Sequence, residues 1–279
     1  MGAYANLAGL EVGDGYPVRI AGAINVSPES FYKGSVAADE DTLRQRAERM
    51  AAEGADMLDV GAMSTAPYLE TAISEAEEIR RLTWAIGVLR SAVALPISVD
   101  TKRYRVASAA LDAGGAVIND VSGFRHDPAM AQVAAQRSQG AILMASETWP
   151  GAPDPLGTVR ELLQQSLFLS DAAGLPRDRV VLDPGIGFFR RAAISWDLWD
   201  CEILRHLGKL QTLGQPILVG LSRKSFIGKV LGHQDPAERL PGSLAATTVA
   251  VLNGAQLVRT HDVGPTRDVI RMAEALRPR

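Results

Sequence analysis

The chain has almost no cysteine, since Cys201 is the only one among 279 residues. One thiol excludes a disulfide framework, a zinc ribbon and a CxxC redox site, because each of these needs at least two cysteines. A lone cysteine is also typical of proteins kept in a reducing compartment. We therefore expect a cytoplasmic location.

The chain also lacks an excess of one charge and any long apolar run. Its formal net charge is −3, so it has no basic stripe of the kind that binds nucleic acid or an anionic membrane. No apolar stretch approaches the ~20 residues of a membrane helix, and the N-terminus has neither the early positive charge nor the apolar run of a signal peptide. With 47% hydrophobic residues, the chain can bury a large core. We expect a globular protein that binds neither nucleic acid nor membranes.

What the chain has instead is a repeat, in which a short apolar run is followed by a longer segment of helical spacing. The predicted strands are Val18–Val26, Met57–Val60, Ile97–Val99, Ala116–Ile118, Ala141–Met144, Val180–Leu182, Ile217–Val219 and Gln256–Val258. The predicted helices are Asp41–Glu53, Ser74–Ala92, Tyr104–Ala113, Pro128–Gln136, Thr158–Ala173, Leu198–Leu213, Leu240–Asn253 and Pro265–Leu276. Eight such units predict an α/β fold, a (β/α)8 TIM barrel that forms a single domain over residues 1–279. An open doubly wound sheet is the alternative if one or two strands are misassigned.

Polar residues end nearly every predicted strand. In a TIM barrel these ends form the active site. The residues at these positions are Asn25, Asp59, Asp100, Asn119, Asp120, Met144, Asp183, Ser222, Arg223, Lys224, Arg259, Thr260 and His261. One Asp or Asn after a strand is more often a cap or turn residue. Asp59 and Asp120, the latter through Ser122, are candidates for such structural roles.

The charged groups divide into two sets. Arg223, Lys224, Arg259 and His261 follow the last two strands, where barrels frequently bind phosphate, and so they predict an anion site. In the alternative, Arg223 and Arg259 pair with surface carboxylates. The second set, which consists of Asp100, Asn119 and Asp183, suits a heterocycle with several N–H donors.

No pattern for a protein nucleophile or a metal cage is present. Ser222, His261 and Asp183 could form a triad, but no nucleophile elbow supports it. The four histidines lack ligand spacing. Mg²⁺ held partly by a substrate phosphate needs only one or two protein oxygens, and Asn25 could supply one.

Several segments, taken in order, resemble the dihydropteroate synthase family. They are INVSPESFYKGS (24–35), DMLDVGAMST (56–65), ISVDTKR (97–103), VINDVSGF (117–124), LDPGIGF (182–188), VGLSRKSFIG (219–228) and RTHDV (259–263). The resemblance is closest to the archaeal-type branch, whose members have NVSPESF and GAMSTAPY where most bacterial members have NVTPDSF and GGESTRPG.

The resemblance implies a homodimer that joins 6-hydroxymethyl-7,8-dihydropterin diphosphate to p-aminobenzoate, releasing pyrophosphate, with Mg²⁺ as cofactor. It implies a pterin site of Asp100, Asn119, Asp183 and Lys224, with Met144 and Phe188 as further substrate-binding residues. The implied diphosphate and Mg²⁺ site holds Asn25, Arg259 and His261, with Arg223 nearby, Asn25 being the metal ligand. The implied arylamine site holds Ser222, Phe31, Thr65 and Pro67.

The implied chemistry is dissociative substitution at the pterin methylene. Pyrophosphate leaves, the resulting cation is delocalised into the pterin and stabilised by Asp100 and Glu29, and the amine then attacks. Asp100, Lys224 and Glu29 are the implied catalytic residues. No protein nucleophile is needed.

Three departures from the family pattern concern the loops. Ala66 stands where the family usually has arginine, Glu29 where it has aspartate, and LMASETWPG where many members have Met-His-Met-x-Gly. Since alanine has no donor for the acceptor's acid group, a ribosylated aminobenzene phosphate is the alternative acceptor. A pterin-dependent methyltransferase and a non-catalytic pterin-binding homologue are less favoured alternatives, because the anion cluster is retained.

Overall fold

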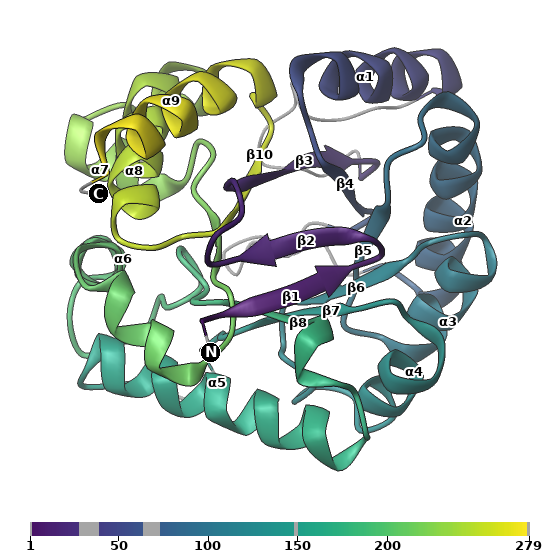
Figure 1. Cartoon of the computed structure of the whole chain (residues 1–279), viewed down its shortest axis with the longest axis horizontal. Helices are drawn as coiled ribbons and strands as arrows, with labels where there is room; N and C mark the ends of the chain where they lie inside the picture. Colours follow the sequence, from purple (N-terminus) through teal and green to yellow (C-terminus); the bar gives the residue numbers. More distant parts are fainter. Residues whose placement is uncertain (1, 28–38, 64–72, 148–149, 278–279) are drawn as a thin grey trace.

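Eight parallel strands form the centre of the molecule (Figure 1), in a computed structural model that describes residues 2–27, 39–63, 73–147 and 150–277. The strands are β3 (Arg19–Asn25), β4 (Met57–Gly61), β5 (Ile97–Asp100), β6 (Val117–Asp120), β7 (Ala141–Met144), β8 (Val180–Asp183), β9 (Leu218–Gly220) and β10 (Leu257–Thr260). They pair in the order β8-β7-β6-β5-β4-β3-β10-β9. A parallel bridge between Leu182 and Ile217 joins the two ends. The predicted TIM barrel is confirmed, and the open sheet is wrong.

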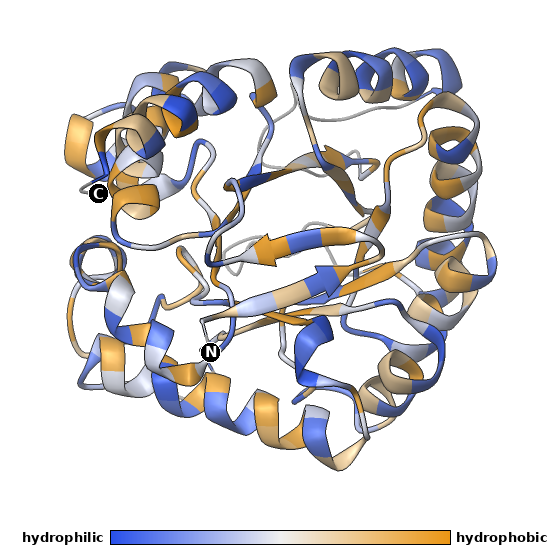
Figure 2. Ribbon diagram, viewed as in Figure 1, coloured by the Kyte–Doolittle hydropathy of each residue, from blue (hydrophilic) through white to orange (hydrophobic). Residues whose placement is uncertain are grey.

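Nine α-helices of the described ranges surround these strands (Figure 1). They are α1 (Glu40–Glu53), α2 (Glu75–Ala92), α3 (Tyr104–Asp112), α4 (Met130–Arg137), α5 (Pro155–Ala172), α6 (Trp196–Arg205), α7 (Ser225–Leu231), α8 (Leu240–Leu252) and α9 (Val263–Leu276). Figure 2 shows apolar and polar residues alternating along the helices, as expected when one face packs on the strands. Within the described part of the chain, no helix is long and apolar enough to cross a membrane.

An antiparallel hairpin, which was not predicted, closes the N-terminal end of the barrel. Its strands are β1 (Tyr4–Leu7) and β2 (Leu10–Gly13), and they lie across the barrel in Figure 1. The hairpin belongs to a buried apolar cluster with the inward side chains at the start of the barrel strands. The members of this cluster, the floor, are Ala5, Leu7, Val12, Ala21, Met57, Val117, Ile142, Val181, Leu218 and Leu257.

Two helix predictions differ from the structure. The predicted helix Leu198–Leu213 is broken at His206, which has a non-helical backbone, and continues as the 3-10 helix η3 (Leu207–Leu213). Helix α7 was not predicted, because its seven residues directly follow the Ser-Arg-Lys segment and are too few to show a helical period.

Candidate active site

The inward side chains change from apolar to polar along several of the barrel strands. Because side chains alternate in a strand, the residue two positions beyond a floor residue also points inward. Such residues are Asp59, Asn119, Met144, Asp183 and Arg259, which follow the floor residues Met57, Val117, Ile142, Val181 and Leu257. The side chains of Asp59, Asp100, Asn119 and Asp183 are buried. The mouth is therefore a buried polar layer resting on an apolar floor.

Arg259 lies at the centre of this layer. Its Nε donates to Asp59 Oδ2 at 2.5 Å, and its Nη2 donates to Asp100 Oδ2 at 3.4 Å. Asn119 Nδ2 donates to both oxygens of Asp59 at 3.2 Å. Asp59 therefore does more than end a strand, since it joins a residue of the predicted pterin site to one of the predicted diphosphate site. Arg259 does pair with carboxylates, yet its side chain keeps 27% of its surface exposed toward the mouth.

Asp183 ends β8 beside Met144, its partner in the β7–β8 register. Its Oδ1 accepts a hydrogen bond from Gly185 N at 2.8 Å. Gly185 has a φ of +73°, and a Cβ at this position would lie 1.8 Å from the backbone oxygen of Ala145. Only glycine fits there. The Asp-Pro-Gly turn thus holds the Asp183 carboxylate at the mouth.

Lys224 reaches the same place from the loop after β9. Its Nζ donates to the backbone oxygen of Ile186 at 2.8 Å and lies 4.6 Å from the centre of the Phe188 ring. The structure thus brings Lys224 together with the loop of Asp183, although 41 positions separate the two residues in the sequence.

Burial changes the protonation of these groups. Burial, and then the negative charge of Asp59, raise the pKa of Asp100 to about 7. Burial raises the pKa of Asp183 to about 6, and it lowers the pKa of Lys224 to about 8. Burial, followed by the charge of Arg259, lowers the pKa of His261 to about 3. His261 is therefore neutral at pH 7, a correction to its place in the predicted cationic cluster. Shifts of this size are common at functional sites.

Arg223 departs most from the predicted anion cluster. Its guanidinium donates to both oxygens of Asp262 at 2.9 Å and to the backbone oxygens of Pro236 and Ala237. Only 6% of Arg223 is exposed. This geometry is the carboxylate-paired alternative, and it holds the loop after β9 against the start of α9.

Ser222 and His261 lie together beside that pair. His261 Nδ1 is 3.0 Å from Ser222 Oγ. The nearby carboxylate is Asp262, 3.4 Å from the same hydroxyl and already paired with Arg223. The carboxylate beside Ser222 and His261 is therefore Asp262, and the triad of Ser222, His261 and Asp183 considered from the sequence is not formed.

Other predicted positions have plainer roles or lie outside the described residues. Asp120 accepts hydrogen bonds from Ser122 N, Ser122 Oγ and Phe124 N at 2.6–2.9 Å. It therefore caps the turn, which is the structural role considered for it from the sequence. Asn25 ends β3, half-buried and in register with Gly61. Outside the described residues lie Glu29, Phe31, Thr65, Ala66 and Pro67.

The sequence analysis missed Asp200, a fully buried acid on α6 whose Oδ1 accepts from Gly187 N at 2.8 Å. One signal was available, since Asp200 falls at helical spacing with Trp196, Ile203 and Leu204, on the apolar face of its helix. A charged residue in such a stripe needs a partner.

The loops after β7 and β8 are also joined. The Glu147 carboxylate accepts from Arg191 N at 2.8 Å and from Arg191 Nε at 3.0 Å. Gly151 N donates to Arg191 O, and Ala193 N donates to Ala152 O. The SETWPG departure therefore gives this wall of the mouth an acid that anchors the neighbouring loop.

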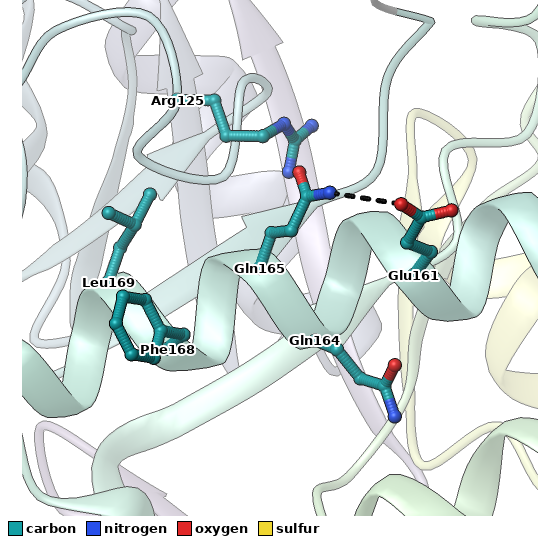
Figure 3. A pocket seen from close by; sticks show the side chains of 6 residues that line it. All are labelled: Arg125, Glu161, Gln164, Gln165, Phe168 and Leu169. Carbon is teal, nitrogen blue, oxygen red and sulfur yellow. Dashed lines mark hydrogen bonds between the residues drawn. The ribbon is translucent and has the colours of Figure 1, made fainter.

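A shallow hollow lies away from the mouth, on the outer side of α5 (Figure 3). Its lining residues are Arg125, Glu161, Gln164, Gln165, Phe168 and Leu169. Gln165 Nε2 donates to Glu161 Oε1 across it at 3.4 Å. Since none of these residues belongs to the buried polar layer, the hollow is separate from the candidate site.

Comparisons with known proteins give the relatives of this chain. Residues 21–261 match a family model described as pterin binding enzyme. The dihydropteroate synthase of Synechocystis sp. is 38% identical, covering 92% of this chain and 89% of that relative. The dihydropteroate synthase of Bacillus subtilis is 35% identical, covering 92% and 88%. The solved structure of Xanthomonas albilineans dihydropteroate synthase with 4-aminobenzoic acid has a TM-score of 0.88 at 35% identity, covering 99% of this chain and 98% of that one.

Proposed function

Since the chain belongs to the pterin-binding enzyme family, we propose that its barrel mouth joins 6-hydroxymethyl-7,8-dihydropterin diphosphate to p-aminobenzoate and releases pyrophosphate. The relatives named dihydropteroate synthase confirm the transferase activity predicted from the sequence. One observation carries the placement of the site: Asp183, Asn119 and Lys224 surround one buried polar mouth. Residues 1–279 act as a single domain in this proposal.

The pterin would lie against Asp183, Asn119 and Lys224. The Asp183 carboxylate accepts from the amino group and the N3–H edge of the ring, while the Lys224 ammonium donates to the acceptor side. Asp59 holds the Nδ2 of Asn119, so the amide oxygen of Asn119 is left to accept from a pterin N–H. Met144 and Phe188 supply apolar contacts to the ring.

The diphosphate would lie at Arg259 and His261. Arg259 contributes the charge, and the neutral imidazole of His261 contributes a hydrogen bond. Arg223 acts indirectly, because it fixes Asp262 and the loop of Ser222. Asp59 and Asp100 hold the guanidinium of Arg259 at the mouth.

We propose that a magnesium ion would be held here by Asn25 together with the substrate's phosphates. Within the described ranges, no group of three or more His, Cys, Asp or Glu side chains could hold a metal. Asn25 offers one amide oxygen, a ligand type that Mg²⁺ accepts alongside substrate phosphates. Bound in this way, the ion would neutralise part of the leaving group's charge.

The proposed reaction is a dissociative substitution. Arg259 stabilises the negative charge that develops on pyrophosphate, and Asp100, ionised above about pH 7, stabilises the cation left on the pterin methylene. Glu29 is proposed as a second carboxylate for that cation. The amine then attacks, and no protein nucleophile takes part.

The arylamine would approach from the side of Ser222, with Phe31, Thr65 and Pro67 contributing from the first two loops. With Ala66 in the second loop, p-aminobenzoate is proposed to bind without a guanidinium from that position. The acceptor of the solved relative, 4-aminobenzoic acid, supports this choice.

We further propose a homodimer formed through α6, α7 and α8. These neighbouring helices expose the apolar side chains Leu198, Val230, Leu231, Val249 and Leu252, and a second copy of the chain would cover them. In light scattering, Leu198→Glu with Val230→Glu should halve the mass; an unchanged mass would place the interface elsewhere. The cytoplasmic location stays a prediction.

Pyrophosphate release is the test of the proposed reaction. With Mg²⁺, the pterin diphosphate and p-aminobenzoate, we expect stoichiometric pyrophosphate and dihydropteroate, and little pyrophosphate when the arylamine is omitted. If only a ribosylated aminobenzene phosphate supports release, the alternative acceptor is the right one. If no arylamine supports release, the proposal fails.

A further inference from the structure

Asp200 is a buried acid that the proposed reaction does not use. Its side chain is 0% exposed, and Oδ1 accepts from Gly187 N at 2.8 Å. Within the part of the chain that the structure describes, Oδ2 has no hydrogen-bond partner. A carboxylate buried with one oxygen unpaired lowers stability, so its presence calls for another explanation.

Asp200 approaches the mouth from behind. Helix α6 lies outside the barrel. Trp199, the residue before Asp200 on this helix, is fully buried and stacks on Phe189 with 4.7 Å between ring centres. This packing fixes the helix against the loop after β8. Asp200 therefore reaches the backbone of the loop that carries Phe188, without entering the mouth itself.

The Gly187 peptide is the point at which Asp200 and Lys224 meet. Gly187 has a φ of +87°, and a Cβ there would lie 3.2 Å from Lys224 Cδ. Its N–H is held by Asp200, its carbonyl accepts from Arg190 Nε at 3.1 Å, and the preceding carbonyl, of Ile186, accepts from Lys224 Nζ. Three charged side chains thus fix two consecutive carbonyls and one N–H of this turn.

Charged side chains of both signs surround Asp200 and Lys224. Lys224 and Arg190 face Asp200 with positive charge, and Asp197 of the same helix adds a weaker negative one. Asp183 and Asp200 face Lys224 with negative charge, against Arg259 and Arg190. Burial raises the pKa of Asp200 to about 6, so at pH 7 and above it is mainly an anion.

We propose that Asp200 is a positioning residue for the pterin end of the site: it fixes the Gly187 turn from behind and supplies the negative charge that holds the ammonium of Lys224 against the loop. This inference rests on the proposed function, because Lys224 is taken to bind the pterin. Asp200 itself touches no substrate.

The first test is Asp200→Asn, which removes the charge and keeps an acceptor for Gly187 N. We expect pterin affinity, measured by calorimetry at pH 8, to fall roughly three- to tenfold, and the alkaline limb of kcat/KM to move about half a pH unit lower. KM for the arylamine should not change. The Tm at pH 8 should stay equal or rise, because a strained buried charge is removed. The control is Glu202→Gln, which neutralises a half-buried acid on the same helix, one that pairs with Arg205 and His206 instead of the Gly187 turn.

The second test places Asp200→Asn in a Lys224→Gln background. If Asp200 acts through Lys224, it should produce no further loss of pterin affinity there. Equal pterin affinity and equal pH limbs for Asp200→Asn and Glu202→Gln would overturn the inference, as would fully additive losses in the double variant. Absence of pyrophosphate release by the natural protein would instead overturn the proposed function, and the affinity measurements would still report on Asp200.

Discussion

The floor and the mouth of the barrel are two layers of side chains on the same strands, and they are two residues apart along each strand. At the floor, Met57 and Leu257 pack with Leu7 of the hairpin in an apolar cluster. Two residues further along, Asp59 and Arg259 form a buried ion pair. The floor stabilises the fold by burying apolar surface, whereas the mouth buries charges whose pKa values are shifted. Stability and function are thus assigned to opposite ends, as is usual in this fold.

The largest effect is expected at the floor. Leu7→Ala removes a fully buried side chain and should lower the free energy of unfolding by about 2–5 kcal/mol. Because Leu7 lies in the hairpin, on the side of the floor opposite to the mouth layer, kcat/KM of the folded fraction should not change. Urea unfolding and steady-state assays check this, and a fall in kcat/KM at full folding would break the separation of the two ends.

Lys224→Ala should have the converse effect. It deletes a charge-assisted hydrogen bond of ~1.5–3 kcal/mol, which corresponds to a loss of roughly 10- to 150-fold in kcat/KM. The Tm should change little, because the side chain is only half-buried at the mouth. Lys229→Ala, at an exposed position of α7, is the matched control. Equal kinetics for the two variants would remove Lys224 from the pterin site.

The mouth should also govern how stability depends on pH. Since burial raises the pKa of Asp183 to about 6, the folded state binds more protons than the unfolded state between about pH 4 and 6. The contribution of Asp183 to stability therefore falls as the pH rises through that window. Asparagine does not titrate, so the variant lacks this loss. The free energy of unfolding of Asp183→Asn, minus that of the natural protein, should therefore increase by roughly 1–3 kcal/mol from pH 4 to pH 8. A constant difference between the two proteins in unfolding experiments at both pH values would contradict this sign.

Arg259→Ala tests the anion side of the mouth. Pyrophosphate with Mg²⁺ at about ten times its dissociation constant should stabilise the natural protein by ~1.4 kcal/mol, or roughly 3–5 °C in Tm. The shift should vanish in Arg259→Ala, whatever that variant's own Tm. A full shift in the variant would mean that the anion binds elsewhere.

The smallest effect is expected from Ala66→Arg, at a position outside the described residues. A guanidinium would add a bidentate contact for the acid group of the acceptor, so KM for p-aminobenzoate should fall a few-fold and sulfonamide inhibition should tighten. The alternative is that another residue of the first loop, such as Lys33, already makes this contact. In that case the measured KM would be low in the natural protein and unchanged or higher in the variant.

The barrel was predictable because its signals are local. Each strand–helix unit shows its own apolar spacing, and the count of eight determines closure. The hairpin was not predictable in this way, since no helix follows β1 or β2 and both strands are stabilised by packing on the floor. The helix break at His206 has only a weak signal, since no proline is present and Gly208, two residues later, is a glycine of the kind that a helix interior tolerates at a cost.

In the site, the sequence could predict which residues meet but not how they pair. The strand ends predicted that Asp183 and Lys224 lie at one mouth but put them in different sets, and only the family resemblance implied that the two share the pterin site. The pairing of Arg223 with Asp262 and the burial that makes His261 neutral depend on packing between loops that are distant in the sequence. Asp200 was missed because it lies on a helix outside the barrel and not at a strand end.

The central claim is that the buried polar mouth is the pterin site, and one measurement tests it most directly. Isothermal titration calorimetry of the dihydropterin at pH 8 should show binding to the natural protein and to Leu7→Ala with equal affinity. Asp183→Asn should bind at least about tenfold more weakly, because one acceptor of the ring's N–H edge becomes a donor. Equal affinity of Asp183→Asn and the natural protein would contradict the account.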